Sequence, residues 1–179
     1  MSIYRTITEV GQKFVSKATL FRYGFNWSPM YRRSTGKLFY VSPDLHEIKL
    51  RIPISYKNRN YMNTIFGGSM FSAVDPIPMI QLTQILGNQY VVWDKSAEIK
   101  FKQPGKDDLY ADFIFTPKEI ATIQERVASE NEIEIFKLTQ LTYKDDSKVI
   151  CEVNKKIYIA SKAFYKEKLA NRKNKNILI

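Results

Sequence analysis

A long apolar run, residues Ser69 to Leu86, limits the possible folds of this chain more than any other feature. It contains no Lys, Arg or Glu, and its apolar residues are spread over most of a helical wheel. This pattern predicts a helix buried nearly all round, roughly 27 Å long at about 1.5 Å per residue. A membrane span of that length would be more apolar and would not carry the polar residues Ser72, Asp75, Gln81, Thr83 and Gln84. We therefore expect a central helix buried inside a globular protein.

The carboxylate of Asp75 is the anomaly in this run. A buried carboxylate costs several kcal/mol unless it is paired or put to use. Pro76 and Pro78 follow it directly, and a proline inside a helix costs about 3 kcal/mol because it removes a hydrogen bond. Two interpretations remain open. The helix either kinks beside a functional acid, or Asp75 caps a second helix that begins at Pro76.

The remaining hydrophobic patterns predict an α+β protein. Helical spacing occurs over 1–33, with a break at 26–29, and over 117–130, while alternation predicts strands over 36–43, 47–54, 97–102, 109–115, 132–143 and 149–159. A phase change between Ile135 and Phe136 indicates a bulge. Antiparallel strands around one apolar helix imply a curved sheet wrapped over that helix. We expect one domain over 1–179, with an N-terminal helical segment (1–33), a core (34–161) and a basic C-terminal tail (162–179).

The charge balance is strongly basic, with 28 Lys and Arg against 18 Asp and Glu and a formal net charge of +10. Such a charge favours anionic partners such as phosphates, coenzyme A, nucleic acid or an acidic membrane, although a soluble protein with a basic surface is the simpler interpretation. The tail contains no known nucleic-acid motif, so we do not expect nucleic acid as a partner.

Cysteine and histidine usage excludes several classes of site. Cys151 is the single cysteine, so an internal disulfide is excluded. Together with the lack of a recognisable signal peptide or transmembrane segment, this predicts a cytoplasmic location. One His, one Cys and no clustered carboxylate pair do not supply the usual metal ligands. We expect neither a metal nor a cofactor.

Two sequence blocks carry a resemblance to a known family. They are NRNYMNTIFGGSMFSAVDP and YVVWDKSAEIKFKQPGKDDLYADF. Together they resemble the DUF4442 family of hotdog proteins, which lies near the PaaI-like acyl-CoA thioesterases, and the resemblance covers roughly residues 26–161. It implies a hotdog fold, in which a curved antiparallel sheet wraps a long central helix. It also implies a homodimer, or a tetramer built from dimers, with the site at the subunit boundary.

The resemblance also implies site residues. The main-chain N–H of Gly68 would hold the thioester oxygen, and Asp75 would act as general base or nucleophile. The expected substrate-binding residues are Asn60, Phe66, Gly67, Ser69 and Ser72. Because no base for a serine nucleophile lies in this segment, Ser69 and Ser72 can equally be caps or packing residues. In the second block, we expect Trp93 to pack and its charged neighbours Asp94 and Lys95 to pair or cap.

One departure from the thioesterase pattern concerns the residue before the glycines. The thioesterases usually carry His-Gly-Gly, whereas this chain has Phe66 preceded by Ile65, where DUF4442 members often keep a His. Asn63, or Asn60, could partly substitute, since an amide both donates and accepts hydrogen bonds; we count Asn63 with the catalytic residues.

Three functions follow from these patterns. The first is hydrolysis of an acyl-CoA or acyl-carrier thioester. The second is a non-catalytic protein that binds a fatty acyl chain or acyl thioester in the same pocket, favoured by the apolar Ile65 and Phe66. The third, binding of nucleic acid or membrane through the basic surface, has the weakest support.

Overall fold

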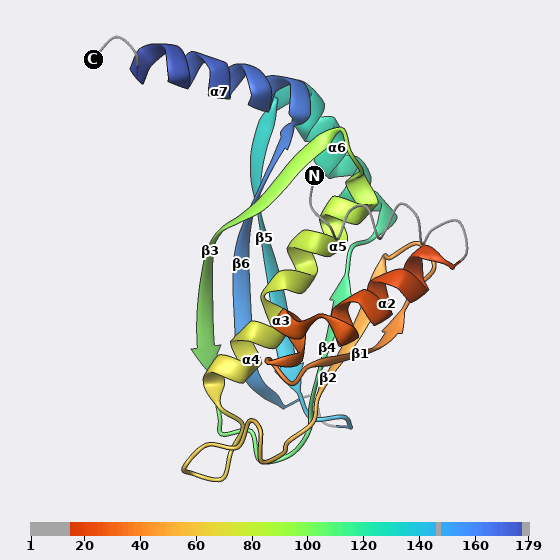
Figure 1. The fold of residues 1–179 in the computed structure, drawn as a ribbon, viewed down its shortest axis with the longest axis vertical. Coiled ribbons are helices and arrows are strands. Elements are labelled where there is room, and N and C mark those ends of the chain that lie inside the picture. The colour runs from red at the N-terminus through yellow and green to blue at the C-terminus, as the bar shows by residue number, and fades with distance from the viewer. Residues whose placement is uncertain (1–14, 146–147, 177–179) are drawn as a thin grey trace.

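A computed structural model describes residues 15–145 and 148–176 of the chain. An antiparallel six-stranded sheet, in the order β1-β2-β4-β5-β6-β3, curves around a central pair of helices (Figure 1). The helices are α2 (Lys17–Trp27), α3 (Pro29–Arg32), α4 (Gly67–Val74), α5 (Pro76–Leu86), α6 (Pro117–Glu130) and α7 (Lys162–Asn176). The strands are β1 (Lys37–Val41), β2 (Glu47–Ile52), β3 (Tyr90–Phe101), β4 (Leu109–Ile114), β5 (Glu132–Thr142) and β6 (Val149–Ser161).

The central apolar run forms two helices, α4 and α5, that follow each other along the sheet (Figure 1). The boundary falls at Asp75, and α5 begins at Pro76, as one of the two interpretations required. The Asp75 side chain makes no capping hydrogen bond, however, and its backbone stays helical (φ −47°, ψ −53°). The expectation of burial all round is wrong on one face, where Gly68 and Ser72 are exposed.

The N-terminal helices cover one edge of the sheet. The expected break is confirmed, since α2 ends at Trp27 and α3 begins at Pro29; residues 1–14 of the predicted helical segment lie outside the described residues. The amide of Asn26 donates to the Leu38 carbonyl and accepts from the Leu38 N–H, both at 2.8 Å. This side chain satisfies the open edge of β1 as a neighbouring strand would.

Strand β3 forms the opposite edge and is longer than predicted. It begins at Tyr90 and pairs with β6 along its whole length, with a register shift between Asp94 and Ser96. The shift interrupts the period-2 pattern, which is why alternation alone located only residues 97–102. No other strand of the described residues pairs with the outer edge of β3.

The register of β5 corrects a second expectation. Ile135 and Phe136 pair with successive residues of β6, so the bulge predicted between them is wrong; the register shift lies between Leu141 and Thr142. The phase change arose because an apolar residue, Phe136, takes an outward position and is 65% exposed. The helix predicted over 117–130 is confirmed as α6, which connects β4 to β5.

The basic tail continues as α7, which projects from one end of the sheet (Figure 1). Its first turns are held by Tyr165, whose ring meets Trp93 edge-on at 4.9 Å, and by an ion pair of Lys168 with Glu132. Among the helices of the described residues, none is long and apolar enough to cross a membrane.

Candidate functional site

The open face of the central helices carries the candidate catalytic residues. Gly68, Ser72, Asp75 and Met79 recur every three or four residues and so share one side of α4 and α5. Gly68 and Ser72 are exposed, while Asp75 and Met79 are half-buried. An open strip that carries the Ser72 hydroxyl and the Asp75 carboxylate therefore runs along the helix pair.

The centre of this site is Lys155, which the sequence patterns did not single out. Its ammonium Nζ donates to Asp75 Oδ1, to the Asp75 carbonyl and to Asp94 Oδ2, each at 2.6 Å. The Lys155 side chain is 0% exposed. It lies on β6, Asp94 on β3 and Asp75 at the junction of α4 and α5. One buried cation thus joins three elements and holds two carboxylates.

The two carboxylates have different surroundings. The Asp75 side chain is 43% exposed, whereas that of Asp94 is 25% exposed. Burial raises the pKa of Asp94 above its ordinary value, although Lys155 acts in the opposite direction. Asp94 Oδ1 is buried and has no hydrogen-bond partner among the described residues. Asp75 is therefore the more accessible of the two carboxylates to a substrate or water molecule.

The start of α4 offers free main-chain donors. The Phe66 carbonyl accepts from the N–H groups of Ser69 and Met70, at 2.9 and 3.2 Å. The N–H groups of Gly67 and Gly68 have no acceptor in the described part of the chain. Since α4 begins here, its dipole adds positive potential at these donors.

Aromatic rings lie close to both glycines. A Cβ on Gly67 would lie 2.7 Å from the ring of Phe101, and one on Gly68 would overlap the ring of Phe66. The Phe66 ring is 57% exposed and lies against Gly68. Phe66 therefore flanks the donor N–H at the position where the thioesterase pattern has a histidine.

The two asparagines of the preceding loop have different environments. Asn60 Oδ1 accepts from the N–H groups of Met62 and Thr64, at 2.9 and 3.1 Å, and its Nδ2 donates to Thr64 Oγ1. The Asn60 side chain thus organises the turn. Asn63 is exposed and has a left-handed backbone (φ 58°), which asparagine tolerates. Of the two, Asn63 has the freer amide.

The serines of α4 are not activated nucleophiles in this chain. Ser69 is buried, and its carbonyl accepts a long bond of 3.4 Å from the exposed Ser72 hydroxyl. The roles assigned to Asn60, Asn63, Phe66, Gly67, Gly68, Ser69, Ser72 and Asp75 stay predictions. The described residues contain no group of three or more His, Cys, Asp or Glu that could hold a metal ion.

The sequence did contain a signal for the missed lysine. Alternation along β6 places Cys151, Val153, Ile157 and Ile159 on the inward face, and Lys155 occupies the same phase. An inward lysine facing a helix with a lone acid indicates an ion pair. For the second block, the expected packing of Trp93 is confirmed by its stacking on Tyr158 with ring centroids 4.6 Å apart.

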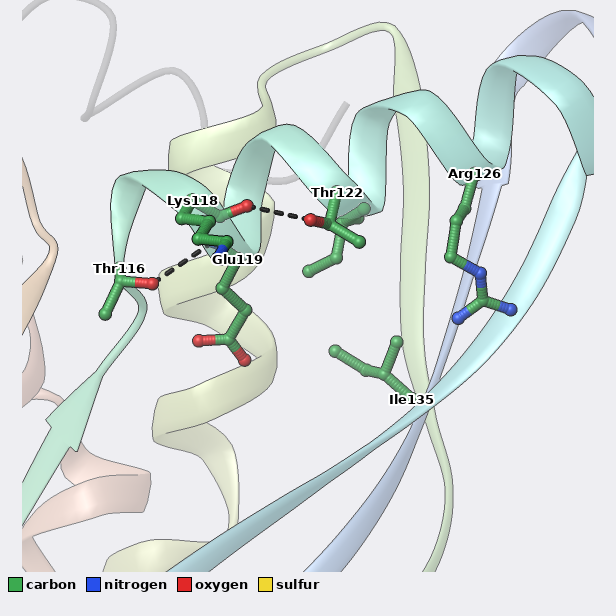
Figure 2. A pocket seen from close by; sticks show the side chains of 7 residues that line it. Thr116, Lys118, Glu119, Thr122, Arg126 and Ile135 are labelled. Carbon is green, nitrogen blue, oxygen red and sulfur yellow. Dashed lines mark hydrogen bonds between the residues drawn. The ribbon is translucent and has the colours of Figure 1, made fainter.

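Two pockets lie away from this face. One, of about 360 Å³, opens between α6 and β5 and is lined by Thr116, Lys118, Glu119, Thr122, Ile123, Arg126 and Ile135. Figure 2 shows Glu119 and Arg126 reaching from α6 toward the strand that carries Ile135. The second, of about 230 Å³, lies between β4 and β5.

Comparison with known families adds to this geometry. Residues 17–159 match the model of DUF4442, a domain of unknown function. The chain belongs to the DUF4442 family. No curated protein matches this DUF4442 chain.

Solved structures establish the fold of this DUF4442 protein. A Pseudomonas aeruginosa protein described as a probable thioesterase is 18% identical with a TM-score of 0.70, covering 80% of this chain and 95% of the other. A putative thioesterase from Shewanella oneidensis is 14% identical with a TM-score of 0.57, covering 80% and 96%. Thioesterase superfamily member 2 of zebrafish is 16% identical with a TM-score of 0.53, covering 80% and 94%. The DUF4442 chain has the hotdog fold, as the resemblance implied.

Proposed function

We propose that this DUF4442 protein hydrolyses an acyl thioester, carried by coenzyme A or by a carrier protein, and does so as a homodimer. One observation carries the proposal. The half-buried Asp75 carboxylate, held by the buried Lys155, lies on the same open helix face as the free N–H of Gly68. A base and an oxyanion donor on one face are the two groups that acyl transfer to water requires.

The chemistry follows from these groups. The Gly68 N–H donates to the thioester carbonyl oxygen, and the start of α4 stabilises the negative charge that grows there. Asp75 accepts a proton from a water molecule, whose oxygen attacks the carbonyl carbon. The tetrahedral intermediate then collapses, the C–S bond breaks and the thiolate leaves and takes up a proton. In an alternative route, the Asp75 carboxylate attacks the carbonyl carbon directly and the thiolate leaves. Water then hydrolyses the resulting anhydride and restores the carboxylate.

Distance along the helix supports the proposed homodimer. Gly68 and Asp75 are seven residues apart, which is about 10 Å along the axis at ~1.5 Å per residue. One thioester group cannot contact both within one chain. In a symmetric dimer the same face is presented twice in opposite directions, so Gly68 of one copy can meet Asp75 of the other. The net charge of +10 suits the phosphates of coenzyme A.

The test is thiol release from acyl-CoA substrates of several chain lengths. Asp75→Asn keeps the shape of the side chain but removes the base, so we expect kcat to fall about 10²- to 10⁴-fold with KM little changed. Asp112→Asn, at an exposed carboxylate of β4, is the matched control and should behave as wild type. Wild-type protein without turnover above buffer at every chain length would end the proposal.

A non-catalytic acyl-binding protein is the second candidate, and the Phe66 ring against Gly68 favours it. Under the enzyme proposal, Phe66→Ala opens access to the donor N–H and should leave or raise kcat. Under the binding proposal, neither the wild type nor Phe66→Ala turns over substrate. Native mass spectrometry would then show an acyl ligand retained by the wild type and lost more readily from Phe66→Ala.

A further inference from the structure

The sheet is open between β4 and β5. Strand β4 pairs with β2 along its whole length, but with β5 it pairs only at Tyr110 and Thr142. Beyond that pair the strands separate toward α6, which connects them (Figure 1). The main-chain groups of the separated segments lack the partners that a continuous sheet would provide.

A buried glutamine of α5 partly fills this opening. Gln81 is 0% exposed, and its Nε2 donates to the carbonyl of Leu45 at 2.7 Å and to that of Phe113 at 3.3 Å. In both bonds the side-chain amide nitrogen donates to a main-chain carbonyl beside the opening. Gln81 Oε1 is buried and has no donor among the described residues. Because buried acceptors in proteins are nearly always paired, this oxygen marks a place for a donor.

A pocket lies at this point. It measures about 230 Å³ and is lined by Pro78, Gln81, Asp112, Phe113, Ile114, Phe115, Lys137, Leu138 and Thr139. Five of these nine residues are apolar, and two of the five, Ile114 and Leu138, are 47% and 55% exposed. The pocket is smaller than the roughly 300–1,000 Å³ of sites for drug-sized ligands, so it suits a smaller molecule.

The charges around the pocket are already paired. Lys137 Nζ binds both carboxylate oxygens of Glu119, at 2.8 and 2.9 Å, and lies 4.1 Å from the centre of the Phe115 ring. Asp112 pairs with Lys49 at 3.4 Å. No uncompensated charge among these residues would balance an ionised ligand, so a neutral one is favoured.

We propose that the opening between β4 and β5 is a second ligand site, which binds a small, neutral, mainly apolar molecule through a hydroxyl group that donates to Gln81 Oε1. The apolar body would lie against Ile114 and Leu138, the exposed apolar residues of the lining. Gln81 lies six residues after Asp75, or about 120° away round the helix. The site therefore does not depend on the thioesterase proposal.

Amide chemical shifts of the full-length protein, titrated with benzyl alcohol and with toluene, test the proposal. The two probes share a ring, and only benzyl alcohol has a hydroxyl. Because one neutral hydrogen bond separates them, benzyl alcohol should bind about three- to tenfold more tightly. The largest shift changes should fall on Phe113, Ile114 and Thr139.

Substitutions at the entrance of the pocket test where the probe binds. Leu138→Trp at the exposed rim should weaken benzyl alcohol binding at least about tenfold by filling the entrance. Phe136→Trp, at another exposed position of the same strand that does not line the pocket, should bind as wild type. Gln81→Met should lower the affinity for benzyl alcohol to that for toluene. If this variant does not fold, the affinity ratio of the two probes in the wild type and the result for Leu138→Trp test the proposal.

Several results would overturn the proposal. They are equal affinity for the two probes, shift changes confined to other elements, and unchanged binding by Leu138→Trp. Absence of binding by either probe would overturn it as well.

Discussion

Lys155 is the residue on which the candidate site depends. A fully buried lysine is rare unless it is paired, and this one is shared by Asp75 and Asp94. The arrangement leaves a local net charge of −1 from these three side chains when both carboxylates are ionised. The pair geometry fixes the Asp75 carboxylate at the helix junction, so that it does not swing freely over the open face.

Lys155→Met tests this role. The substitution keeps an unbranched side chain but removes the cation, so two carboxylates would face each other across an apolar site. We expect the free energy of unfolding to fall by about 3 kcal/mol, the lower end for a broken buried ion pair because both acids keep some solvent access. Urea denaturation measures the change, and Lys156→Met, at the next and half-exposed position of β6, is the control.

Asp94 gives the site a specific pH dependence. Because burial raises its pKa above the ordinary value of 3.8, the folded chain binds this proton more tightly than the unfolded chain does. The contribution of Asp94 to the free energy of unfolding is therefore largest at low pH and is lost as the pH rises through the raised pKa. Asp94→Asn removes this contribution.

The quantity to measure is the gain in the free energy of unfolding when the pH is raised from about 4 to about 7. We expect the gain to be larger in Asp94→Asn than in the wild type, while Asp112→Asn, at an exposed acid, keeps the wild-type gain. An unchanged or smaller gain in Asp94→Asn would show that the Asp94 carboxyl does not have a raised pKa.

Among the elements, the two edge strands differ in a way that bears on assembly. Edge β1 is covered by α2, through the hydrogen bonds of Asn26 to Leu38. Edge β3 has no such cover among the described residues, and Ala97 near its middle is exposed. An open, long edge strand is a surface on which a second copy can add its own β3.

Ala97→Arg tests assembly through β3. In a lone chain this exposed position should accept arginine with little loss of stability, but in a dimer joined at β3 two arginines would meet near the symmetry axis. We expect light scattering to show a mass near that of one chain, 20.9 kDa, in place of twice that value. Ala128→Arg, on the exposed side of α6, should stay dimeric. A wild type of single-chain mass would contradict the proposed dimer.

At the scale of the whole molecule, the proposed site would be complete only between two copies. The open helix face carries both the donor N–H of Gly68 and the Asp75 carboxylate, but about 10 Å apart on one axis. A two-fold axis beside this face would generate two equivalent sites, each with one group from each chain.

Mixing two inactive variants tests this arrangement. Gly68→Val places a branched side chain beside the donor N–H, where the Phe66 ring must move aside, and Asp75→Asn removes the base. In a mixed dimer, one site would keep Gly68 from one chain and Asp75 from the other. Unfolding and refolding the two variants together should restore about a quarter of wild-type activity, because about half of the dimers are mixed and each has one intact site. If both groups acted within one chain, mixing would restore nothing.

Local patterns were sufficient for much of this protein. The central apolar run, the hairpin of β1 and β2, helix α6 and the break before Pro29 could be predicted because each depends on periodicity and on nearby proline or glycine. Asp75 could be singled out because a lone acid and two prolines conflict with an apolar helix.

Tertiary packing decided the rest. Lys155 binds Asp75, which is 80 residues away in the sequence, and Asp94, which is 61 residues away. No local pattern reports such contacts between separate elements. The opening between β4 and β5 and the outward position of Phe136 likewise depend on strand pairing. Strand pairing depends on residues that are far apart in the chain, so these two features could be seen only in the tertiary structure.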